Sequence, residues 1–491
     1  MSVMEKDKAG KITRTDLWIG GKSVPPSSGR YFEDHSPIDN RVYSEAAEGT
    51  IEDVDRAVRA AHEAFASYGK TLAKDREVWL FRAAELMERR KEEVIDILID
   101  EVGSPITKCM FEVDMSVRMF RAAAGVPRRL TGKTIPSDRP GCFSMSVREP
   151  VGVVAGITPF NVPLVKAAKQ ASVALACGNT FVLMPSEEAP LVASWFARIL
   201  HDAGFPAGSF NVVTGNPFDI GDSLTSHPLV KSVLFCGSTR VGRHIAEICG
   251  RDLKPVTLEL GGKSPAIILK DADLDVAVPA AAAGIFFFQG QACMGTSRMI
   301  VERAIADEFI TRFTEVAKGM KIGDLRQPDT AVGPIISDRQ RERVKTHIDD
   351  AVAKGARMTV GGNWAGNVCE PTVLTGVTPD MVVYAEETFG PVTAIYIVDG
   401  PEEALKIAND TSYGLSAAIF TNNVNNAFIL AQGIHAGMVH VNAASLQDEP
   451  HVPFGGMGQS GLGREGTETD IEAMTEWKWI TVQLPVEGGG H

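Results

Sequence analysis

The chain has 491 residues, of which 44% are hydrophobic and 23% charged, and its formal net charge is −13. This length accommodates two or three domains with large cores, and the composition is that of an ordinary globular protein. The negative charge disfavours nucleic acid and anionic membranes as main partners, because both bind basic surfaces.

Residues 1–16 are polar and charged, so we expect no secretory signal and a cytoplasmic location. The most apolar stretch, residues 276–288, contains Pro279 and is shorter than the roughly 18 residues of a membrane span. We therefore expect a buried helix there and no membrane partner. The seven cysteines are scattered and include no CxxC pair, which argues against a disulfide framework and against a bound metal.

The pattern of apolar residues predicts the elements in chain order. Residues 51–123 space them three and four apart, which indicates helices, and residues 141–150 alternate like an exposed strand. From Val151 onward, short apolar strands alternate with helices, and a second such series begins near Asp271. This alternation predicts an α/β fold with two domains in tandem, each built on a parallel sheet covered on both faces.

Cys293 stands out among the cysteines because of its neighbours. It lies in FFFQGQACMGTSR, residues 286–298, between Gly290 and Gly295. Glycines allow the backbone to turn closely around a ligand, and converging N–H groups help a thiol to ionise and hold an oxyanion. The alternative is a packed cysteine in a loop.

Two further polar residues are candidates for chemistry. Glu259 ends an apolar strand before Gly261 and Gly262, where an acid is costly to bury unless it has a task such as general base; the alternative is an edge-strand residue. Asn161 follows another strand, where its amide can donate to an oxyanion; the alternative is simple turn chemistry.

Two turns are candidates for cofactor binding. Residues 235–242, FCGSTRVG, connect a strand to a helix, and the free N–H groups of a helix N-terminus suit a pyrophosphate. The turn lacks the G-x-G-x-x-G fingerprint, so an ordinary connection stays open. Glu387 in EETFGP, residues 386–391, is either a ligand or a solvated loop acid.

In order and spacing, these segments together resemble the aldehyde dehydrogenase superfamily over nearly the whole chain. The matching segments are FN, MPSE, the GST turn, ELGGKSP, GQACMGTSR, EETFGP and PFGGMGQSGLGREG. The resemblance implies a Rossmann-like NAD-binding domain, an α/β catalytic domain and a small β element for oligomerisation. The implied bounds are 1–124 and 147–258 for the cofactor domain, 259–448 for the catalytic domain, and 125–146 and 449–491 for the oligomerisation segments.

The resemblance also implies the reaction. Cys293 would attack the aldehyde to form a thiohemiacetal, whose oxyanion Asn161 and the Cys293 N–H would stabilise. Hydride transfer to the nicotinamide would leave a thioester, and Glu259 would activate the water that hydrolyses it. A glutamate at this position favours water over coenzyme A as the acyl acceptor.

A larger set of residues is implied for the cofactor. Glu387 would bind the nicotinamide ribose, Phe389 would pack near the ring, and Gly237 and Ser238 would contact the pyrophosphate. The full set is Thr158, Pro159, Phe160, Met184, Ser186, Glu187, Gly215, Gly237, Ser238, Leu260, Gly261, Glu387 and Phe389.

The chain departs from the family pattern at two positions. Met184 stands where a lysine commonly binds the adenosine ribose, and losing that charged hydrogen bond would weaken cofactor binding by about 1.5–3 kcal/mol. Glu187 remains and would repel a 2′-phosphate, so we expect NAD, with NADP possible. Cys236 replaces a common threonine, a change we expect to be minor.

The substrate is expected to be an aromatic aldehyde. Residues 441–466 resemble the branch of benzaldehyde, salicylaldehyde and vanillin dehydrogenases, which commonly carries an acidic pair such as Asp448-Glu449 before PFGG. The expected pocket residues are Val162, Phe286, Phe287 and Phe454. At least two of the three consecutive phenylalanines are expected to be core, and Lys166 and Lys169 to be solvated, although one of them could meet an anionic substituent.

Assembly and alternatives complete the expectations. Residues 141–150 and 477–484 are candidate exposed edges, which pair readily with another subunit, so a homodimer or homotetramer is expected. The alternatives are an aliphatic or semialdehyde dehydrogenase, a non-catalytic binding protein, an acyl-phosphate reductase and a metalloenzyme. The intact Cys293, Glu259 and Asn161 argue against the second, and Glu259 against the third.

Overall fold

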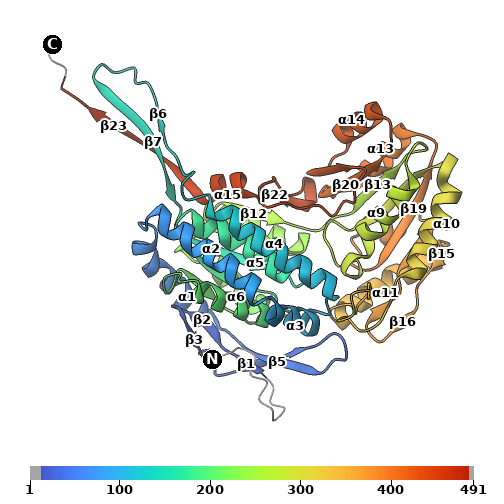
Figure 1. Ribbon diagram of the computed structural model, residues 1–491, viewed down its shortest axis with the longest axis horizontal. Helices are drawn as coiled ribbons and strands as arrows, with labels where there is room; N and C mark the ends of the chain where they lie inside the picture. Colours follow the sequence, from blue (N-terminus) through green and yellow to red (C-terminus); the bar gives the residue numbers. More distant parts are fainter. Residues whose placement is uncertain (1–12, 486–491) are drawn as a thin grey trace.

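The computed structural model describes residues 13–485. Figure 1 shows two α/β lobes and a long β arm that projects from the first lobe. The two sheets of the lobes are mainly parallel, as the alternation of strands and helices predicts. Within residues 13–485, every helix is too short or too polar to cross a lipid bilayer.

The first lobe is built on an eight-stranded sheet. In spatial order its strands are β22 (Gly461–Leu462), β12 (Val256–Glu259), β11 (Val230–Cys236), β8 (Val153–Thr158), β9 (Thr180–Pro185), β10 (Phe210–Val212), β2 (Leu17–Ile19) and β3 (Lys22–Val24). The five central strands are parallel, and β22 joins β12 antiparallel from the C-terminal part of the chain. Beside it lies a three-stranded sheet of β1 (Thr13–Thr15), β5 (Val42–Ala47) and β4 (Tyr31–His35).

Helices cover both faces of this sheet. Along β8, Val153 and Ala155 face one apolar layer and Val154 the other, because successive side chains alternate across a strand. The layer with Val154 contains α2 (Ala73–Arg89), α3 (Lys91–Val102), α4 (Ile106–Ala124), α5 (Pro163–Ala176) and α6 (Pro190–Asp202). The other contains α1 (Ile51–Tyr68), α7 (Pro217–Thr225) and α8 (Thr239–Arg251).

The second lobe repeats this arrangement on a seven-stranded sheet. Its strands in order are β15 (Arg357–Val360), β18 (Thr372–Thr375), β19 (Val392–Val398), β14 (Thr296–Glu302), β13 (Ser264–Ile268), β20 (Ser416–Phe420) and β21 (Met438–Val441). Its helices are α9 (Leu274–Phe286), α10 (Arg303–Gly319), α11 (Asp338–Ala353), α12 (Val382–Ala385), α13 (Pro401–Asn409) and α14 (Val424–Gly433), and a small hairpin joins β16 (Trp364–Ala365) to β17 (Val368–Cys369).

Two details differ from the sequence-based expectation. The second series of strands begins at Ser264 rather than near Asp271, because β13 pairs with β14 and β20 of the second sheet. The apolar helix ends at Phe286 rather than continuing to Phe288. Phe288 and Gln289 have left-handed backbone conformations in the turn η1 (Phe287–Gly290), which an α-helix cannot accommodate.

The arm is a separate three-stranded sheet. It consists of β6 (Lys133–Thr134), β7 (Cys142–Pro150) and β23 (Thr475–Gln483), with α15 (Thr467–Met474) at its base. The strands expected at residues 141–150 and 477–484 therefore pair with each other, in register over nine residue pairs.

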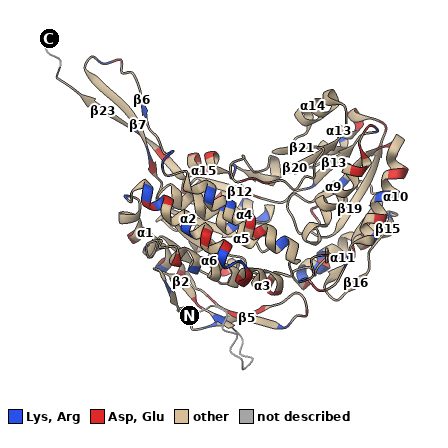
Figure 2. Cartoon of the chain, viewed as in Figure 1, with Lys and Arg blue, Asp and Glu red and all other residues tan. Residues whose placement is uncertain are grey.

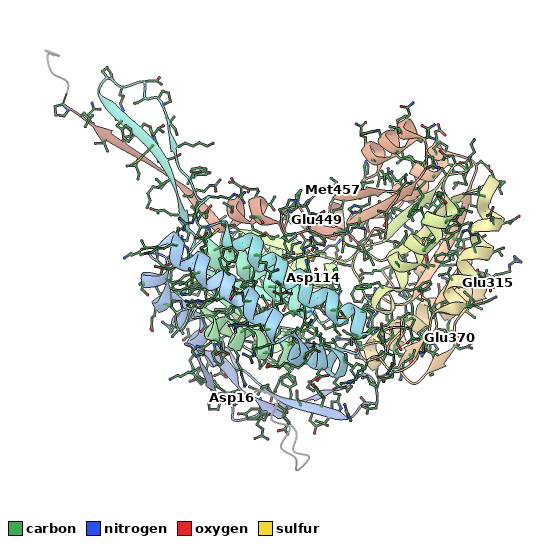
Figure 3. The ribbon with its side chains drawn as sticks, in the orientation of Figure 1. Asp16, Asp114, Glu315, Glu370, Glu449 and Met457 are labelled. Atoms are coloured by element: carbon green, nitrogen blue, oxygen red, sulfur yellow. The ribbon has the colours of Figure 1, made fainter. Side chains whose placement is uncertain are left out.

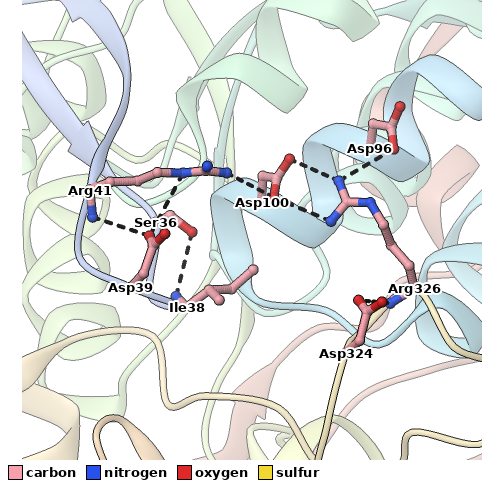
Figure 4. Close-up of polar contacts among 8 residues, drawn as sticks. All are labelled: Ser36, Ile38, Asp39, Arg41, Asp96, Asp100, Asp324 and Arg326. Atoms are coloured by element: carbon pink, nitrogen blue, oxygen red, sulfur yellow. Dashed lines mark hydrogen bonds and ion pairs between the residues drawn. The ribbon is translucent and has the colours of Figure 1, made fainter.

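A carboxylate connects the two lobes. Asp100 of α3 accepts hydrogen bonds from Arg41 at 3.2 Å and from Arg326, which follows α10, at 2.9 Å. Figure 4 shows Asp100 between the two guanidinium groups, with Asp96 as a second contact of Arg326. This cluster fixes the side of the first lobe that bears α3 against the second lobe.

Candidate active site

Cys293 lies in a loop that hydrogen bonds to two other segments hold in place. The side chain of Gln289 donates to the carbonyl oxygens of Gly103 and Pro334 and accepts from Gly333 N. Gln291 accepts from Ile336 N at 3.0 Å. Because both glutamines are buried and bonded to backbone groups, the loop has little freedom.

The loop packs directly on the segment after Glu259. A Cβ atom at Gly262 would overlap with the carbonyl oxygen of Cys293, so only glycine allows this approach. The side chain of Cys293 is half-buried and adjoins the apolar cluster of Leu415, Met438 and Phe454. The structure thus brings together two motifs that the sequence singled out separately.

Asn161 reaches the same loop. It follows β8, is buried, and donates from Nδ2 to the carbonyl oxygen of Gln291 at 2.9 Å. A turn-forming asparagine bonds to its own neighbours, whereas this bond spans 130 positions of the chain. The amide of Asn161 is therefore fixed to the loop at Gln291, two residues before Cys293.

Glu259 is the last residue of β12 and is buried. The strand lies between β11 and β22, so Glu259 is not an edge residue. Among the described residues, neither of its carboxylate oxygens has a hydrogen-bond partner. Burial raises the pKa of Glu259 well above its usual value, although Lys166 opposes that shift. Burial thus favours the uncharged carboxyl over the carboxylate.

The thiol of Cys293 is also protonated in this form. Burial raises its pKa to about 12; Lys166 lowers it, while Glu387 and Glu259 raise it. The glycine-flanked loop alone thus does not ionise the thiol, and attack on a substrate requires that its proton be removed.

Lys166 and Lys169 correct a sequence-based expectation, because both are buried rather than solvated. Lys166 forms an ion pair with Glu465 at 2.6 Å, and Lys169 forms one with Asp448 at 2.7 Å. Their partners come from the C-terminal segment, far along the chain, and the pairing offsets part of the cost of burying the charges.

The cofactor candidates on the nicotinamide side lie close together. Phe160 follows Thr158, the last residue of β8, by two positions. Its ring packs edge to face on that of Phe389, with 5.9 Å between the ring centroids. Glu387 accepts from Gly262 N at 2.9 Å, and a Cβ at Gly261 would overlap with the Glu387 carboxylate. Burial raises the pKa of Glu387 to about 7. Pro159 adjoins Phe160 in the chain, and the buried Leu260 fills the space beside Gly242.

The candidates for the phosphates and adenosine occupy the neighbouring strand ends. Ser238 caps α8 by accepting from Val241 N, and Gly237 N donates to the carbonyl oxygen of Glu259 at 3.0 Å. The Glu387 carboxylate beside Gly261 and the N-terminus of α8 suit the ribose hydroxyls and the pyrophosphate of a dinucleotide. The helix would hold its pyrophosphate and Glu387 a ribose, while the nicotinamide supplies hydride acceptance when the cofactor is bound.

Two of the residues expected near the adenosine are buried by other parts of the protein. Met184 is buried against the layer that contains Ile220, and Gly215 is buried against Gly49. Ser186 and Glu187 are half-exposed, and Arg339 of α11 lies 3.9 Å from the Glu187 carboxylate.

Some of the residues expected to line the substrate pocket lie beside the site, and others lie in the hydrophobic core. Phe454 contacts Cys293, and Phe287 is half-buried against Phe111 of α4. Phe286 instead stacks on Phe313 in the core of the second lobe, and Phe288 is also buried, so two of the three consecutive phenylalanines are core, as expected.

Sequence reasoning missed the contribution of α4 to this region. Val162, directly after Asn161, packs against Met115 and Met119. On α4, Phe111, Met115 and Met119 follow one another at intervals of four residues and so lie on one helical face. This spacing could have indicated a shared apolar surface.

A thiol, a buried carboxyl and a fixed amide meet between two α/β lobes, beside a strand end suited to a dinucleotide. The fold has two α/β lobes, and Cys293 between them is the candidate nucleophile. The aldehyde dehydrogenase family model matches residues 24–480, and the chain belongs to this family.

Relatives and solved structures agree over nearly the full length. The chain is 42% identical to the vanillin dehydrogenase of Pseudomonas fluorescens over 470 residues, 95% of this chain and 97% of that protein. It superposes with a TM-score of 0.94 on the salicylaldehyde dehydrogenase of Pseudomonas putida G7 complexed with salicylaldehyde, at 38% identity and covering 97% and 99% of the two chains. The chain also superposes on the NAD⁺ complex of a Bacillus cereus aldehyde dehydrogenase with a TM-score of 0.93. The identity is 35%, and the match covers 96% of this chain and 97% of that one.

The protein is therefore an NAD(P)-dependent aldehyde dehydrogenase, an oxidoreductase that converts aldehydes to carboxylic acids. This result confirms the resemblance, the α/β fold and the class of reaction that the sequence predicted.

Proposed function

We propose that the protein oxidises an aromatic aldehyde with NAD, and that Cys293, Glu259 and Asn161 carry the reaction. The approach of Gly262 to the Cys293 carbonyl supports this assignment most directly, because it joins the segment of the thiol to that of the buried acid. Asn161, bonded at Gln291, completes the arrangement.

The chemistry follows from these positions. After the Cys293 thiol has lost its proton to water, its sulfur bonds to the aldehyde carbon as the π bond of the carbonyl opens, and the resulting oxyanion accepts hydrogen bonds from Asn161 Nδ2 and the Cys293 N–H. After hydride has left the carbon, Cys293 holds a thioester. Glu259 in its ionised form takes a proton from water, the water oxygen bonds to the acyl carbon, and the carbon–sulfur bond breaks to release the acid and the Cys293 thiolate.

An aromatic substrate is supported by two observations. The relatives reported above are named for vanillin and salicylaldehyde. Around the thiol, Phe454, Leu415 and Met438 form an apolar cluster, and Met115, Met119 and Val162 form another beside Asn161. Flat apolar walls suit an aromatic ring. An aliphatic aldehyde or a semialdehyde is the alternative within the same family.

The preference for NAD rests on Glu187, whose carboxylate would repel the 2′-phosphate of NADP. Arg339 lies 3.9 Å from that carboxylate, and its positive charge keeps NADP possible. Comparing kcat/KM for NAD and NADP in the wild type and in Glu187→Gln tests this point. We expect the substitution to improve NADP use selectively; an unchanged ratio would contradict the assignment.

The assay for the main proposal follows reduced nicotinamide with a panel of aromatic and aliphatic aldehydes. Wild type is compared with Cys293→Ala and with Cys142→Ala, a half-buried cysteine on the arm. We expect the highest kcat/KM for aromatic aldehydes, loss of activity only in Cys293→Ala, and normal activity in the control. A preference for aliphatic aldehydes would show that the aromatic substrate class is wrong. Inactivity with every aldehyde would favour a non-catalytic binding protein.

We also infer that the arm mediates assembly into a homodimer or homotetramer. On β23, Trp477, Trp479 and Val482 are exposed, and on α14 so are Phe428 and Ile429. Strand β21 is one edge of the second sheet among the described residues, and exposed apolar edges pair with other chains. Figure 2 shows few charged residues along the outer arm. Light scattering should give a smaller particle mass for Trp479→Glu than for wild type. An unchanged mass would show that the arm does not mediate assembly.

A cytoplasmic location is proposed from the cysteines. All seven are unpaired, and most are buried, which fits a reducing compartment. Cell fractionation with antibody detection tests this inference, and recovery from an oxidising compartment would overturn it.

A further inference from the structure

A buried ion pair on α4 lies outside the reaction scheme above. Lys108 and Glu112 are one turn apart on this helix and form a salt bridge, and their side chains are 1% and 0% exposed. Lys108 also donates to Ser104 Oγ at 3.0 Å. The free energy cost of burying two charges can exceed what their mutual attraction returns. The pair is therefore poorly explained by stability alone, and the contacts of each partner indicate another role.

Glu112 caps the helix that begins after Asn161. Its Oε2 atom accepts from Leu164 N at 3.1 Å and from Val165 N at 3.3 Å, in the first turn of α5. The N-cap residue of α5, Val162, makes no such bond with its side chain. Buried N–H groups at a helix start need an acceptor, and a carboxylate also suits the positive end of the helix. Glu112 thus fixes the start of α5, two residues beyond Asn161.

Lys108 contacts the turn that precedes the nucleophile. Its ammonium group lies 4.1 Å from the centre of the Phe288 ring, and an attraction between a cation and an aromatic face is strongest where water is excluded. Phe288 is 2% exposed and has a left-handed backbone with a φ of 47°. This conformation is costly for a bulky residue and persists only where neighbours hold it. The contact with Lys108 is one such constraint.

The rest of the turn carries this constraint toward the thiol. Gln289, which follows Phe288, also has a positive φ, of 46°. Gln291 N donates to the carbonyl oxygen of Phe288 at 2.9 Å, and the carbonyl oxygen of Gln291 accepts from Asn161. The backbone from Phe288 to Cys293 is thus a tightly bonded turn. A shift of the Phe288 ring consequently displaces the Cys293 N–H.

The ion pair therefore lies between the two proposed donors to the oxyanion, the amide of Asn161 and the Cys293 N–H. We propose that Lys108 and Glu112 are positioning residues for the oxyanion. Glu112 sets the start of α5, Lys108 sets the turn at Phe288, and their ion pair fixes the distance between the two donors. The inference rests on the proposed oxyanion role of Asn161 and the Cys293 N–H.

This role differs in its consequence from general stabilisation of the fold. Oxidation of an aldehyde passes through an oxyanion, whereas alkylation of the Cys293 thiol by iodoacetamide displaces iodide and forms no oxyanion. Lys108→Met should lower kcat by about 10–100-fold, because a slightly misplaced group costs that much. Alkylation of Cys293 should stay within about twofold of wild type, since the thiol itself is unchanged.

The experiment measures kcat with saturating NAD and aldehyde, and in parallel the alkylation rate of Cys293 by mass spectrometry, in wild type and Lys108→Met. Lys254→Met is the control and should keep both rates, because Lys254 is a largely buried lysine paired with Asp252 at 3.4 Å beside the end of α8. Equal losses of the two rates in Lys108→Met would indicate a merely structural pair and overturn the inference. A wild-type kcat would overturn it too.

A double-mutant cycle tests the connection to the oxyanion. Asn161→Ala already removes one donor, so adding Lys108→Met should lower kcat further by no more than about threefold. Multiplication of the two single losses would overturn the inference and leave the oxyanion role intact. If Asn161→Ala alone keeps the wild-type kcat, the proposed oxyanion role fails, and the inference fails with it.

A second pair of variants covers the case in which Lys108→Met does not fold. Phe288→Leu leaves the ion pair intact and removes only the ring that the ammonium group contacts. Phe313→Leu removes another buried ring, in the core of the second lobe, and is the matched control. Both variants should melt at a lower temperature than wild type. Only Phe288→Leu should lower kcat, by at least about tenfold, while alkylation continues. Equal kcat values in the two variants would overturn the inference.

Discussion

The amide of Asn161 donates to the carbonyl oxygen of Gln291 at 2.9 Å, two residues before Cys293. One hydrogen bond thus ties the end of β8 in the first lobe to the loop of the second lobe that carries the thiol. Figure 3 shows this central region between the lobes, with Glu449 labelled near it on the C-terminal segment. The relative position of thiol and amide therefore depends on how the lobes are held together.

The first prediction concerns this amide. Asn161→Ala removes one donor to the oxyanion and should lower kcat by about 10²–10³-fold, the usual effect of losing one such group. The measurement is steady-state kinetics with saturating NAD. Asn363→Ala, an exposed asparagine of the second lobe, should retain wild-type kinetics. A loss of less than tenfold in Asn161→Ala would contradict the oxyanion role.

The second prediction uses the contact between the two motifs. Gly262→Ala would place a methyl group onto the Cys293 carbonyl oxygen, so the loop must move and activity should fall by at least about 100-fold, as expected for a displaced reacting group. Gly319→Ala meets no atom within 4 Å and serves as the control. Circular dichroism should show that both variants fold; wild-type activity in Gly262→Ala would mean that the loop adapts freely.

The third prediction is a pH dependence of stability. Asp34 is buried, and burial raises its pKa from 3.8 to about 7. Since the fold prefers the protonated acid, this contribution to stability is fully present below about pH 4 and is lost as pH rises through 7. The loss amounts to about 1.4 kcal/mol per pH unit for one proton.

Asp34→Asn removes that titration. Its melting temperature should therefore decline less than that of wild type between pH 4 and pH 7, as followed by differential scanning fluorimetry. Asp39→Asn, at an exposed position near the same sheet, should keep the wild-type slope. Parallel curves for Asp34→Asn and wild type would show that Asp34 does not titrate in this range.

The fourth prediction concerns the connection between the lobes. Asp100→Ala leaves Arg41 and Arg326 without their shared carboxylate (Figure 4). Both arginines are exposed, so solvent screens part of the loss, and we expect a destabilisation of about 1–2 kcal/mol. Chemical unfolding monitored by tryptophan fluorescence measures it. Asp96→Ala, which removes a single 3.5 Å contact of Arg326, should cost less; equal effects would exclude a special role for Asp100.

Local patterns in the sequence were sufficient for the class of protein. Alternating strands and helices predicted the two parallel sheets, and the spacing of the Asn161, Glu259 and Cys293 motifs predicted the family, which the comparisons confirm. Such patterns are readable because the period of apolar residues and the chemistry of short motifs depend on neighbours in the chain.

Only the tertiary structure decided which side chains are buried together. Lys166 and Lys169 look like solvated charges in a helix, but their partners are 299 and 279 positions away. Phe286 and Phe287 are adjacent and identical in type, yet one is core and the other faces α4. Burial, ion pairing and the resulting pKa shifts depend on contacts between distant segments, and no local period of the sequence records those contacts.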